Sequence, residues 1–147
     1  MISITRILVP VDLSEPSNRA LSYAVELADK FAAKLTILYV VPEPAAVLPD
    51  MMMPVPVAPP DDDELTAAGR QSLAELIAAK GLGRLNPDAD VRIGNAKDEI
   101  LAAAKDTHAD LIVLGTHGRG GLAHLFLGSV AEEVVRAAKC PVLTLRG

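Results

Sequence analysis

The fold of this chain is decided by the stretch Leu111-Ile112-Val113-Leu114-Gly115-Thr116-His117-Gly118-Arg119-Gly120-Gly121 and by Leu127-Gly128-Ser129-Val130, which follows it. Four consecutive apolar residues predict a strand that is covered on both faces of a parallel sheet. The glycines allow backbone N–H groups to approach a ligand without interference from a Cβ atom. Ser129 stands where a helix can begin, with Glu132 at capping-box spacing. Because a strand that runs through glycines into a helix N-terminus can hold phosphate, the stretch predicts a nucleotide site.

The composition of the chain predicts one α/β domain over residues 1–147. Half of the residues are apolar and only 3% are aromatic, so aliphatic side chains must fill the core, as they do in sheets with helices on both faces. The net charge is −5 with no cluster of Lys or Arg, which argues against a nucleic-acid-binding surface. The single cysteine, Cys140, excludes an internal disulfide and a Cys-rich zinc site, and we expect it to be a small buried residue.

No segment of the sequence is typical of a membrane helix or a signal peptide. The apolar residues 2–11 are too few to span a bilayer and are interrupted by Arg6, and the stretch 40–60 contains many prolines. We therefore expect a soluble cytoplasmic protein that does not bind membranes.

The N-terminal part of the chain predicts a βαβ unit. Residues 6–12 form a strand rich in β-branched side chains, and Ser14 and Pro16 are typical of the start of a helix. The helix over 15–33 has an apolar face at helical spacing, formed by Ala20, Leu21, Ala24, Leu27, Ala28 and Phe31. Residues 35–41 form the second strand, so the crossover is right-handed.

Residues 42–60 differ from the rest of the chain, because they contain seven prolines and the run Met51-Met52-Met53. Such a loop is either a mobile connector or a lid or partner-docking segment, since Met side chains adapt to varied surfaces. The acids of residues 61–64 then favour a helix N-terminus over a metal site. The helix presents Leu65, Leu73, Leu76 and Ile77, and it ends at Gly81 or Gly83.

The C-terminal part of the chain adds strands at 89–93, 111–114 and 141–145. The first of these alternates with charged residues, so we place it near an edge of the sheet. Asn95 is the expected cap of a helix whose inward residues are Ile100, Leu101 and Ala104. The helix after Ser129 has a core face of Ala131, Val134, Val135 and Ala138. The whole pattern predicts a three-layer α/β/α fold around five parallel strands.

Three turns converge on one crevice if the strand order is 3-2-1-4-5. Ligands of open parallel sheets bind beyond the carboxyl ends of the strands, where the order reverses, here between the first and fourth strands. Asp12 can accept from sugar hydroxyls or the base, and backbone groups near Val40 can pair with an adenine edge. The glycine N–H groups, the Ser129 hydroxyl and Arg119 would hold the phosphates.

Other site types fit the sequence less well. There is no G-x-x-x-x-G-K-[ST] P-loop. The run Gly118-x-Gly120-x-x-Ala123 matches a dinucleotide fingerprint loosely, but it follows the fourth strand and no acid ends the next one. His117 is either a phosphate contact or a plain loop residue, and it lacks metal-ligand spacing with His124. No Ser, His and acid set can be defended as a catalytic triad.

At these residues the sequence resembles the universal stress protein family over essentially its whole length. Gly115, two residues, Gly118, nine residues, and then Gly128-Ser129 is similar to the G-x2-G-x9-G-[S/T] signature of that family's ATP-binding branch. The opening Ile7-Leu8-Val9-Pro10-Val11-Asp12 and the closing Cys140-Pro141-Val142-Leu143 also resemble the family.

The resemblance implies a Rossmann-like fold of the adenine nucleotide alpha hydrolase type with the sheet order 3-2-1-4-5. It also implies ATP in the crevice with Mg²⁺ on the phosphates, and a homodimer through the last strand, at about 141–146. The cofactor-binding residues that it implies, together with the loop residues considered above, are Pro10, Asp12, Val40, Gly115, His117, Gly118, Arg119, Gly128, Ser129 and Val130.

Three functions are compatible with this site. The first is an ATP-binding regulatory module of the stress response, whose nucleotide state is recognised by partners or by the dimer. The second is a slow Mg²⁺-dependent ATP hydrolase or phosphotransferase, since positioned phosphates and a metal permit some hydrolysis. The third is a dimeric scaffold or chaperone-like protein with a structural nucleotide. A complete glycine–serine set without an evident catalytic base favours the first.

Overall fold

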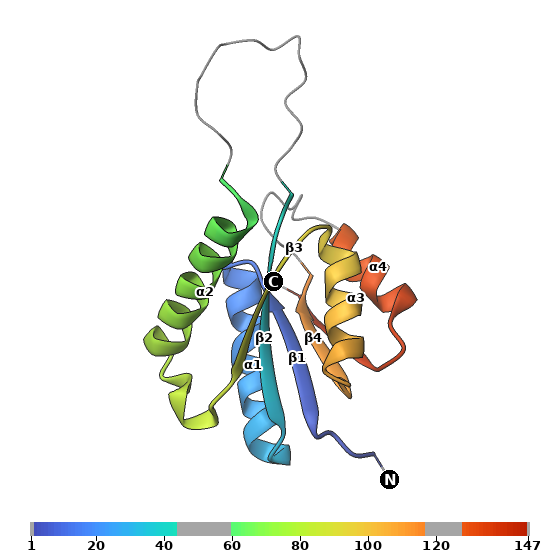
Figure 1. Cartoon of the computed structure of the whole chain (residues 1–147). Helices are drawn as coiled ribbons and strands as arrows, with labels where there is room; N and C mark the ends of the chain where they lie inside the picture. The colour runs from blue at the N-terminus through green and yellow to red at the C-terminus, as the bar shows by residue number, and fades with distance from the viewer. Residues whose placement is uncertain (1, 44–59, 117–127, 147) are drawn as a thin grey trace.

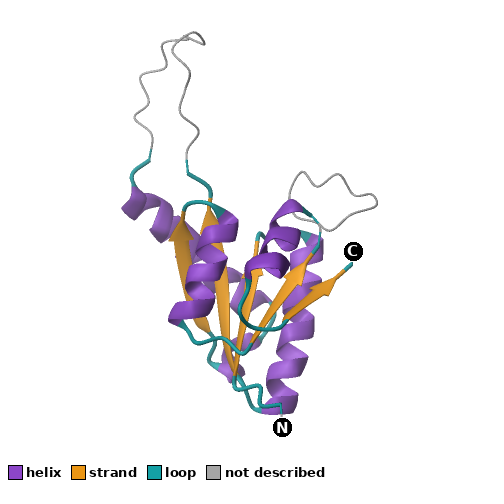
Figure 2. Ribbon diagram, turned by 90° about the vertical axis from the view of Figure 1, so that its right-hand side faces the viewer, coloured by secondary structure: helices purple, strands orange, loops and turns teal. Residues whose placement is uncertain are grey.

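The computed structural model describes residues 2–43, 60–116 and 128–146. Over these ranges the chain forms one sheet of five parallel strands with helices on both faces (Figures 1 and 2). The strands are β1 (Arg6–Val11), β2 (Lys34–Val41), β3 (Asp88–Ile93), β4 (Leu111–Gly115) and β5 (Val142–Leu145). The helices are α1 (Glu15–Phe31), α2 (Asp62–Ala79), the 3-10 helix η2 (Leu82–Leu85), α3 (Ala96–Asp106) and α4 (Ser129–Ala137).

The strand order is β3-β2-β1-β4-β5, which confirms the predicted fold. From β1 the chain first builds outward through β2 to β3, and it then returns to the other side of β1 to add β4 and β5. The order therefore reverses between β1 and β4, where Ile7 pairs with Leu111. The predicted edge position of the third strand is also confirmed, because β3 ends the described sheet on one side.

Two cores lie on opposite faces of the sheet because successive side chains of a strand point to opposite sides. Ile7 and Val9 belong to the first core, which packs against α1 and α2, whereas Leu8 belongs to the second, which packs against α3 and α4. The four apolar residues that open β4 are all buried, as their unbroken run predicts. Cys140 is only partly buried, at the margin of the second core.

Polar side chains begin three of the helices as the sequence predicts. Ser14 accepts a hydrogen bond from the Ser17 N–H at the start of α1, Asp61 caps α2 and Asn95 caps α3. The helix α2 stops at Ala79, and Gly81 follows in the left-handed conformation with a φ of 64°. Of the two glycines considered as terminators, Gly81 is therefore the one that turns the chain.

Three local predictions were wrong. Ser129 does not cap α4: Gly128 occupies the cap position, Ser129 is the first helical residue, and no side chain makes the capping bond. Phe31 is 46% exposed because it ends α1 and the left-handed Ala32 turns the chain away before another turn can cover it. Val135 is 44% exposed because its neighbour Val134 takes the core position, about 100° away around the helix.

The model describes only the ends of the proline-rich segment 42–60, so the connector and lid hypotheses concern residues that lie mostly outside the described part of the chain. Among the described helices, none has the length and apolar character needed to cross a membrane.

Candidate functional site

The candidate site lies at the carboxyl ends of the strands, around the point where the strand order reverses. Strand β1 ends at Val11 and β4 ends at Gly115, and these two strands are neighbours in the sheet. Pro10, which the sequence places in the site, is buried in β1 immediately before the turn. Ligands of open parallel sheets bind in the crevice at this position.

Asp12 is held in a defined orientation by the first turn of α1. Its Oδ1 atom accepts hydrogen bonds from the Ser14 N–H, at 3.0 Å, and from the Ser14 hydroxyl. Its own N–H donates to the Ser17 hydroxyl at 3.1 Å. Leu13, between these groups, has a φ of 67°, which non-glycine residues seldom adopt. Such a strained turn, fixed by its surroundings, is a feature that occurs often at binding sites.

Gly115 is where β4 and the first turn of α1 come into contact. A Cβ atom at this position would lie 2.8 Å from the Pro16 carbonyl oxygen and 2.9 Å from its carbon, which is closer than real Cβ contacts. The sequence predicts that Gly115 allows a ligand to approach the backbone. In the structure the close approach is made by the helix, and it brings the Asp12 turn against the end of β4.

The start of α4 is tied to the same strand end. The Gly128 N–H donates to the Thr116 carbonyl at 2.6 Å, and the Thr116 N–H donates to the Leu145 carbonyl at 3.0 Å. The structure thus brings the Asp12 turn, Gly115 and Gly128-Ser129 together. Ser129 makes no capping bond, so its hydroxyl is not used to cap the helix.

Val40 approaches the crevice from β2. The Val41 carbonyl accepts from the Gly94 N–H at 3.0 Å, so the backbone polar groups of Val41 face β3. These groups alternate sides along a strand, so the Val40 carbonyl faces β1. The last residue of β2 that pairs with β1 is Tyr39, opposite Val11. The Val40 carbonyl is therefore directed into the crevice, beyond the end of β1.

Thr116 was not predicted as a site residue. The residue is 2% exposed, and its hydroxyl oxygen has no hydrogen-bond partner among the residues that the structure describes. A buried hydroxyl without a partner costs free energy, and it marks a place where a bound water or ligand can supply one. In the sequence, Thr116 directly follows Gly115, and this position could have indicated a site residue. However, threonine is also a residue that strands commonly bury.

Of the remaining predicted site residues, the structure describes only Val130. Val130, the second residue of α4, is 37% exposed. His117, Gly118 and Arg119 lie outside the described residues. Within the described ranges, no group of three or more His, Cys, Asp or Glu side chains is arranged to hold a metal ion.

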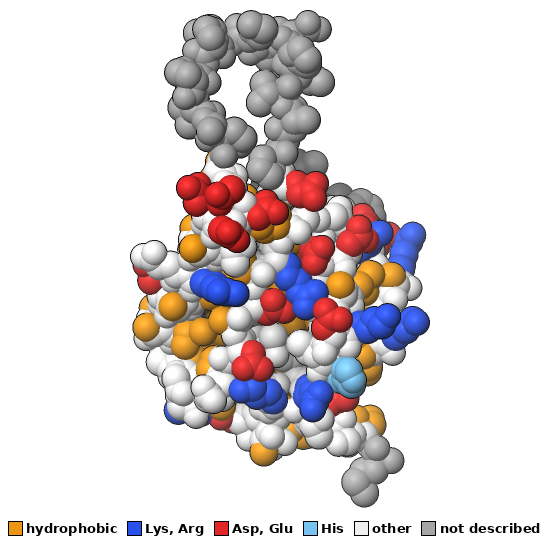
Figure 3. All heavy atoms as spheres, viewed as in Figure 1, with side chains coloured by type: hydrophobic (Ala, Val, Ile, Leu, Met, Phe, Trp, Pro, Cys, Tyr) orange, Lys and Arg blue, Asp and Glu red, His pale blue; other side chains and the backbone are white. Residues whose placement is uncertain are grey.

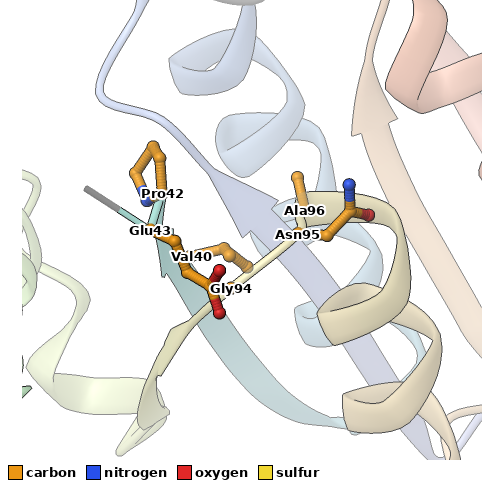
Figure 4. A pocket seen from close by; sticks show the side chains of 6 residues that line it. All are labelled: Val40, Pro42, Glu43, Gly94, Asn95 and Ala96. Atoms are coloured by element: carbon orange, nitrogen blue, oxygen red, sulfur yellow. The ribbon is translucent and has the colours of Figure 1, made fainter. Parts of the chain in front are cut away.

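A hollow of about 350 Å³, which the sequence did not predict, lies next to Val40 (Figure 4). It is formed by the end of β2 and the turn between β3 and α3, and its lining residues are Val40, Pro42, Glu43, Gly94, Asn95 and Ala96. The sequence did contain a signal for this hollow. Gly94-Asn95 directly follows β3, the neighbour of β2, so this turn lies at the same edge of the sheet as the end of β2.

The surface around the site is acidic on one side. Figure 3 shows acidic side chains gathered at the top of this face, over the first turn of α2 at residues 61–64. Elsewhere in the described part of the chain, basic side chains pair with acidic ones, as Lys34 does with Asp88 and Arg84 with Asp29. These pairs give the face a mixed charge rather than a continuous basic track.

Comparisons with known proteins agree with this architecture. The sequence model of the universal stress protein family matches residues 3–146. Universal stress protein MJ0531 of Methanocaldococcus jannaschii is 32% identical over 142 residues, covering 96% of this chain and 81% of its own length. Universal stress protein YxiE of Bacillus subtilis is 33% identical over 148 residues, covering 96% and 98% respectively.

Solved structures of the same family superpose on nearly the whole chain. The universal stress protein UspA from Lactobacillus plantarum has 30% identity and a TM-score of 0.72, covering 98% of this chain and 99% of its own. A universal stress protein solved in complex with cAMP has 26% identity and a TM-score of 0.67, covering 97% of each chain. This protein therefore belongs to the universal stress protein family.

Proposed function

We propose that this protein is a cytoplasmic ATP-binding module of the stress response, and that its nucleotide state is recognised by partner proteins. The observation that carries the proposal is that the Asp12 turn, the end of β4 and the start of α4 meet at the switch point, through the contact of Gly115 with Pro16 and the bond from Gly128 to Thr116. The related structure in complex with cAMP supports an adenine nucleotide as the ligand.

Each part of the crevice has a role in this proposal. The Asp12 carboxylate accepts from the ribose hydroxyls, and the Val40 carbonyl accepts from the adenine edge. Ser129 and the N-terminal N–H groups of α4 donate to the phosphates, where the helix dipole favours negative charge. Pro10, His117, Gly118, Arg119 and Val130 complete the proposed site.

Magnesium is compatible with this arrangement. Mg²⁺ keeps several waters and binds proteins through one or two carboxylates together with substrate phosphates. Phosphate oxygens and waters would supply most of its ligands, so no separate cluster of protein ligands is needed. The ion would neutralise phosphate charge that Arg119 alone does not balance.

We also propose that the protein is a homodimer through β5. This strand ends the described sheet, and all four of its residues are only partly buried. An apolar edge strand left open to solvent favours pairing with another chain. The segment 42–60 is a further proposed contact for a protein partner. Its composition supports this role, and most of it lies outside the described residues.

The test of ATP binding is nucleotide retention followed by calorimetry. Mass spectrometry of the supernatant from heat-denatured protein is expected to detect ATP, and titration is expected to give a Kd below 1 mM, which corresponds to about −4 kcal/mol. Gly118→Val is expected to abolish binding. Ser129→Ala is expected to weaken it at least about tenfold, since it removes a hydrogen bond to a charged group.

A matched control is Ser22→Ala, because Ser22 lies on the exposed surface of α1 and its hydroxyl donates to the Asn18 carbonyl of the same helix. Its affinity for ATP is expected to equal that of the wild type. If no ATP is retained and millimolar ATP gives no heat of binding, the proposed function is wrong.

A further inference from the structure

A row of residues crosses the carboxyl end of the sheet, because the parallel strands lie in register. In this row Val40 of β2 lies opposite Arg92 of β3. The pairing registers of the other strands, continued to the same level, add one residue from the end of each strand. In the order of the strands across the sheet, the row consists of Arg92, Val40, Asp12, Thr116 and Arg146.

Arg146 ends this row beside Thr116, at the edge of the sheet that β5 forms (Figure 2). The Thr116 N–H donates to the Leu145 carbonyl at 3.0 Å, which is the parallel pairing bond that sets Thr116 beside Arg146. Their side chains lie on the face that carries α4, because Leu114 and Val142, at even-numbered positions of the same two strands, pack in the second core.

The guanidinium of Arg146 is available for a ligand. The residue is exposed, and none of the ion pairs among the described residues involves it. It therefore differs from Arg92 at the other end of the row, which is held by Asp90 and Asp106 at 3.0 Å each.

The start of α4 is joined to the same end of the row through the bond from the Gly128 N–H to the Thr116 carbonyl. The first helical bond runs from the Glu132 N–H to the Gly128 carbonyl, and no side chain caps the helix. The N–H groups of its first turn are thus left for another acceptor. The buried Thr116 hydroxyl, which has no partner among the described residues, adds a further donor. Such a set of donors fits an anion.

The row gives the proposed nucleotide a direction. In the proposed site the Val40 carbonyl accepts from the base and Asp12 accepts from the ribose, so the phosphates continue toward Thr116 and the start of α4. Neighbouring strands lie about 5 Å apart, so Arg146 comes one strand beyond Thr116, on the side away from the ribose. Arg146 is therefore placed for the phosphate that is farthest from the ribose.

Arginine suits a terminal phosphate. Its guanidinium is always charged, and its N–H groups match two phosphate oxygens at once. A terminal phosphate offers three oxygens that are not shared with a neighbouring phosphate. A monophosphate instead ends at the start of α4, one strand short of Arg146.

We propose that Arg146 binds the terminal phosphate of the nucleotide and so distinguishes nucleoside triphosphates from monophosphates. The inference rests on the proposed function, because it gives the proposed nucleotide its direction along the row. It adds a specificity-determining residue from β5, a strand that carries none of the site residues predicted from the sequence.

Calorimetric titration with ATP and with AMP tests this role. Arg146→Gln removes the charge and is expected to weaken ATP binding at least about tenfold, the effect of losing a hydrogen bond between charged groups. Its affinity for AMP is expected to equal that of the wild type. Arg146→Lys keeps the charge without the planar fork, and its affinity for ATP is expected to lie between the other two.

The matched control is Arg70→Gln, which removes the same charge from the opposite face of the sheet. Arg70 is an exposed residue of α2, and α2 packs against the first core. Both affinities are expected to equal those of the wild type. An equal loss of ATP binding in Arg70→Gln would assign the effect to net charge and overturn the role of Arg146.

A second variant tests the path of the phosphates independently of Arg146. Thr116→Val removes the hydroxyl and nearly preserves the shape of the side chain. It is expected to weaken ATP and AMP to a similar extent, because both nucleotides carry the phosphate that lies beside Thr116. Unchanged affinity for both nucleotides overturns the path along the row.

The possible outcomes separate the two proposals. An unchanged ratio of ATP to AMP affinity in Arg146→Gln, whether both affinities fall together or neither falls, overturns the inference while ATP binding stands. A wild type that binds neither nucleotide contradicts the proposed function and this inference together.

Discussion

Gly115 lies where strand β4 and helix α1 come closest. The atoms that a Cβ would meet belong to the backbone of Pro16, so they cannot move aside without shifting the first turn of the helix. The same turn orients Asp12 through Ser14 and Ser17. The absence of a side chain at Gly115 therefore allows two elements of the candidate site to pack together.

We expect Gly115→Ala to lower the free energy of unfolding by about 1–3 kcal/mol, as overpacking of a close contact does. Urea denaturation monitored by circular dichroism measures this change. Gly83→Ala is the control, because a Cβ there meets nothing within 4 Å, and its stability is expected to stay within about 1 kcal/mol of the wild type. Equal stability of the two variants would contradict the prediction that a Cβ atom at position 115 is too close to Pro16.

At the scale of the element, β5 combines a paired side with an open one. The Leu145 carbonyl accepts from the Thr116 N–H, and the Pro141 carbonyl accepts from the Ile112 N–H, so the backbone groups of odd-numbered residues face β4. Because these groups alternate, the N–H and carbonyl of Thr144 face outward from the sheet edge. This outward row is the surface through which a second copy would pair.

We expect Thr144→Pro to convert the proposed dimer into a monomer without loss of the fold. Proline removes the outward N–H that strand addition needs, and it leaves the bonds to β4 in place. Thr144→Val keeps the N–H and is expected to remain dimeric. Sedimentation equilibrium distinguishes the two forms. A Thr144→Pro protein that stays dimeric, or a wild type that is monomeric at every concentration, contradicts pairing through β5.

At the scale of the whole molecule, Asp110 joins the starts of two central strands that are far apart in the sequence. Its carboxylate accepts from the Thr5 hydroxyl at 2.7 Å, from the Thr5 N–H at 2.8 Å and from the Arg6 N–H at 3.0 Å. These hydrogen bonds, the one from the Thr5 hydroxyl foremost, hold the pKa of Asp110 below its usual range. These hydrogen bonds fix the start of β1 beside the start of β4, at the end of the sheet opposite the crevice.

The lowered pKa predicts a pH-dependent contribution to stability. A carboxylate whose pKa is depressed in the native state stabilises the fold above the ordinary Asp pKa of about 3.9, and this stabilisation is lost as the pH falls through the native value. We expect Asp110→Asn to be less stable than the wild type at neutral pH, and the difference to close below about pH 4.

Urea unfolding of both proteins between pH 3 and pH 7 measures this difference, with Asp63→Asn as the control for loss of one acidic charge. A gap between Asp110→Asn and the wild type that stays constant over the whole range would contradict the assignment of the effect to the ionised carboxylate.

The local features of the sequence predicted much of the fold correctly. Helix and strand periods, together with Ser14, Asp61 and Asn95 as caps, placed nearly every element within two residues of its observed bounds. These signals are local, because a period reports which side of one element is buried and a cap satisfies backbone groups a few residues away. The resemblance to the family supplied the strand order that the structure confirms.

The same signals failed where burial depends on neighbours that are distant in the sequence. Val135 continues the apolar period of α4 but lies beyond the part of the helix that the sheet covers. Ser129 has the capping spacing, yet the bond from Gly128 to Thr116 starts the helix one residue earlier than that spacing implies. A pattern along one element does not contain the position of the element that packs against it.

The sequence by itself determined which strands and helices follow one another along the chain, and it determined the glycine–serine stretch that follows the fourth strand. Only the tertiary structure decided what that stretch contacts: Gly115 lies against α1, Thr116 joins β5 to α4, and the hollow beside Val40 is formed by a turn that carries no recognisable motif. The physical reason is that hydrophobic periods and caps act over a few residues. A binding site at a switch point depends instead on how far neighbouring strands extend and on how closely separate turns can approach.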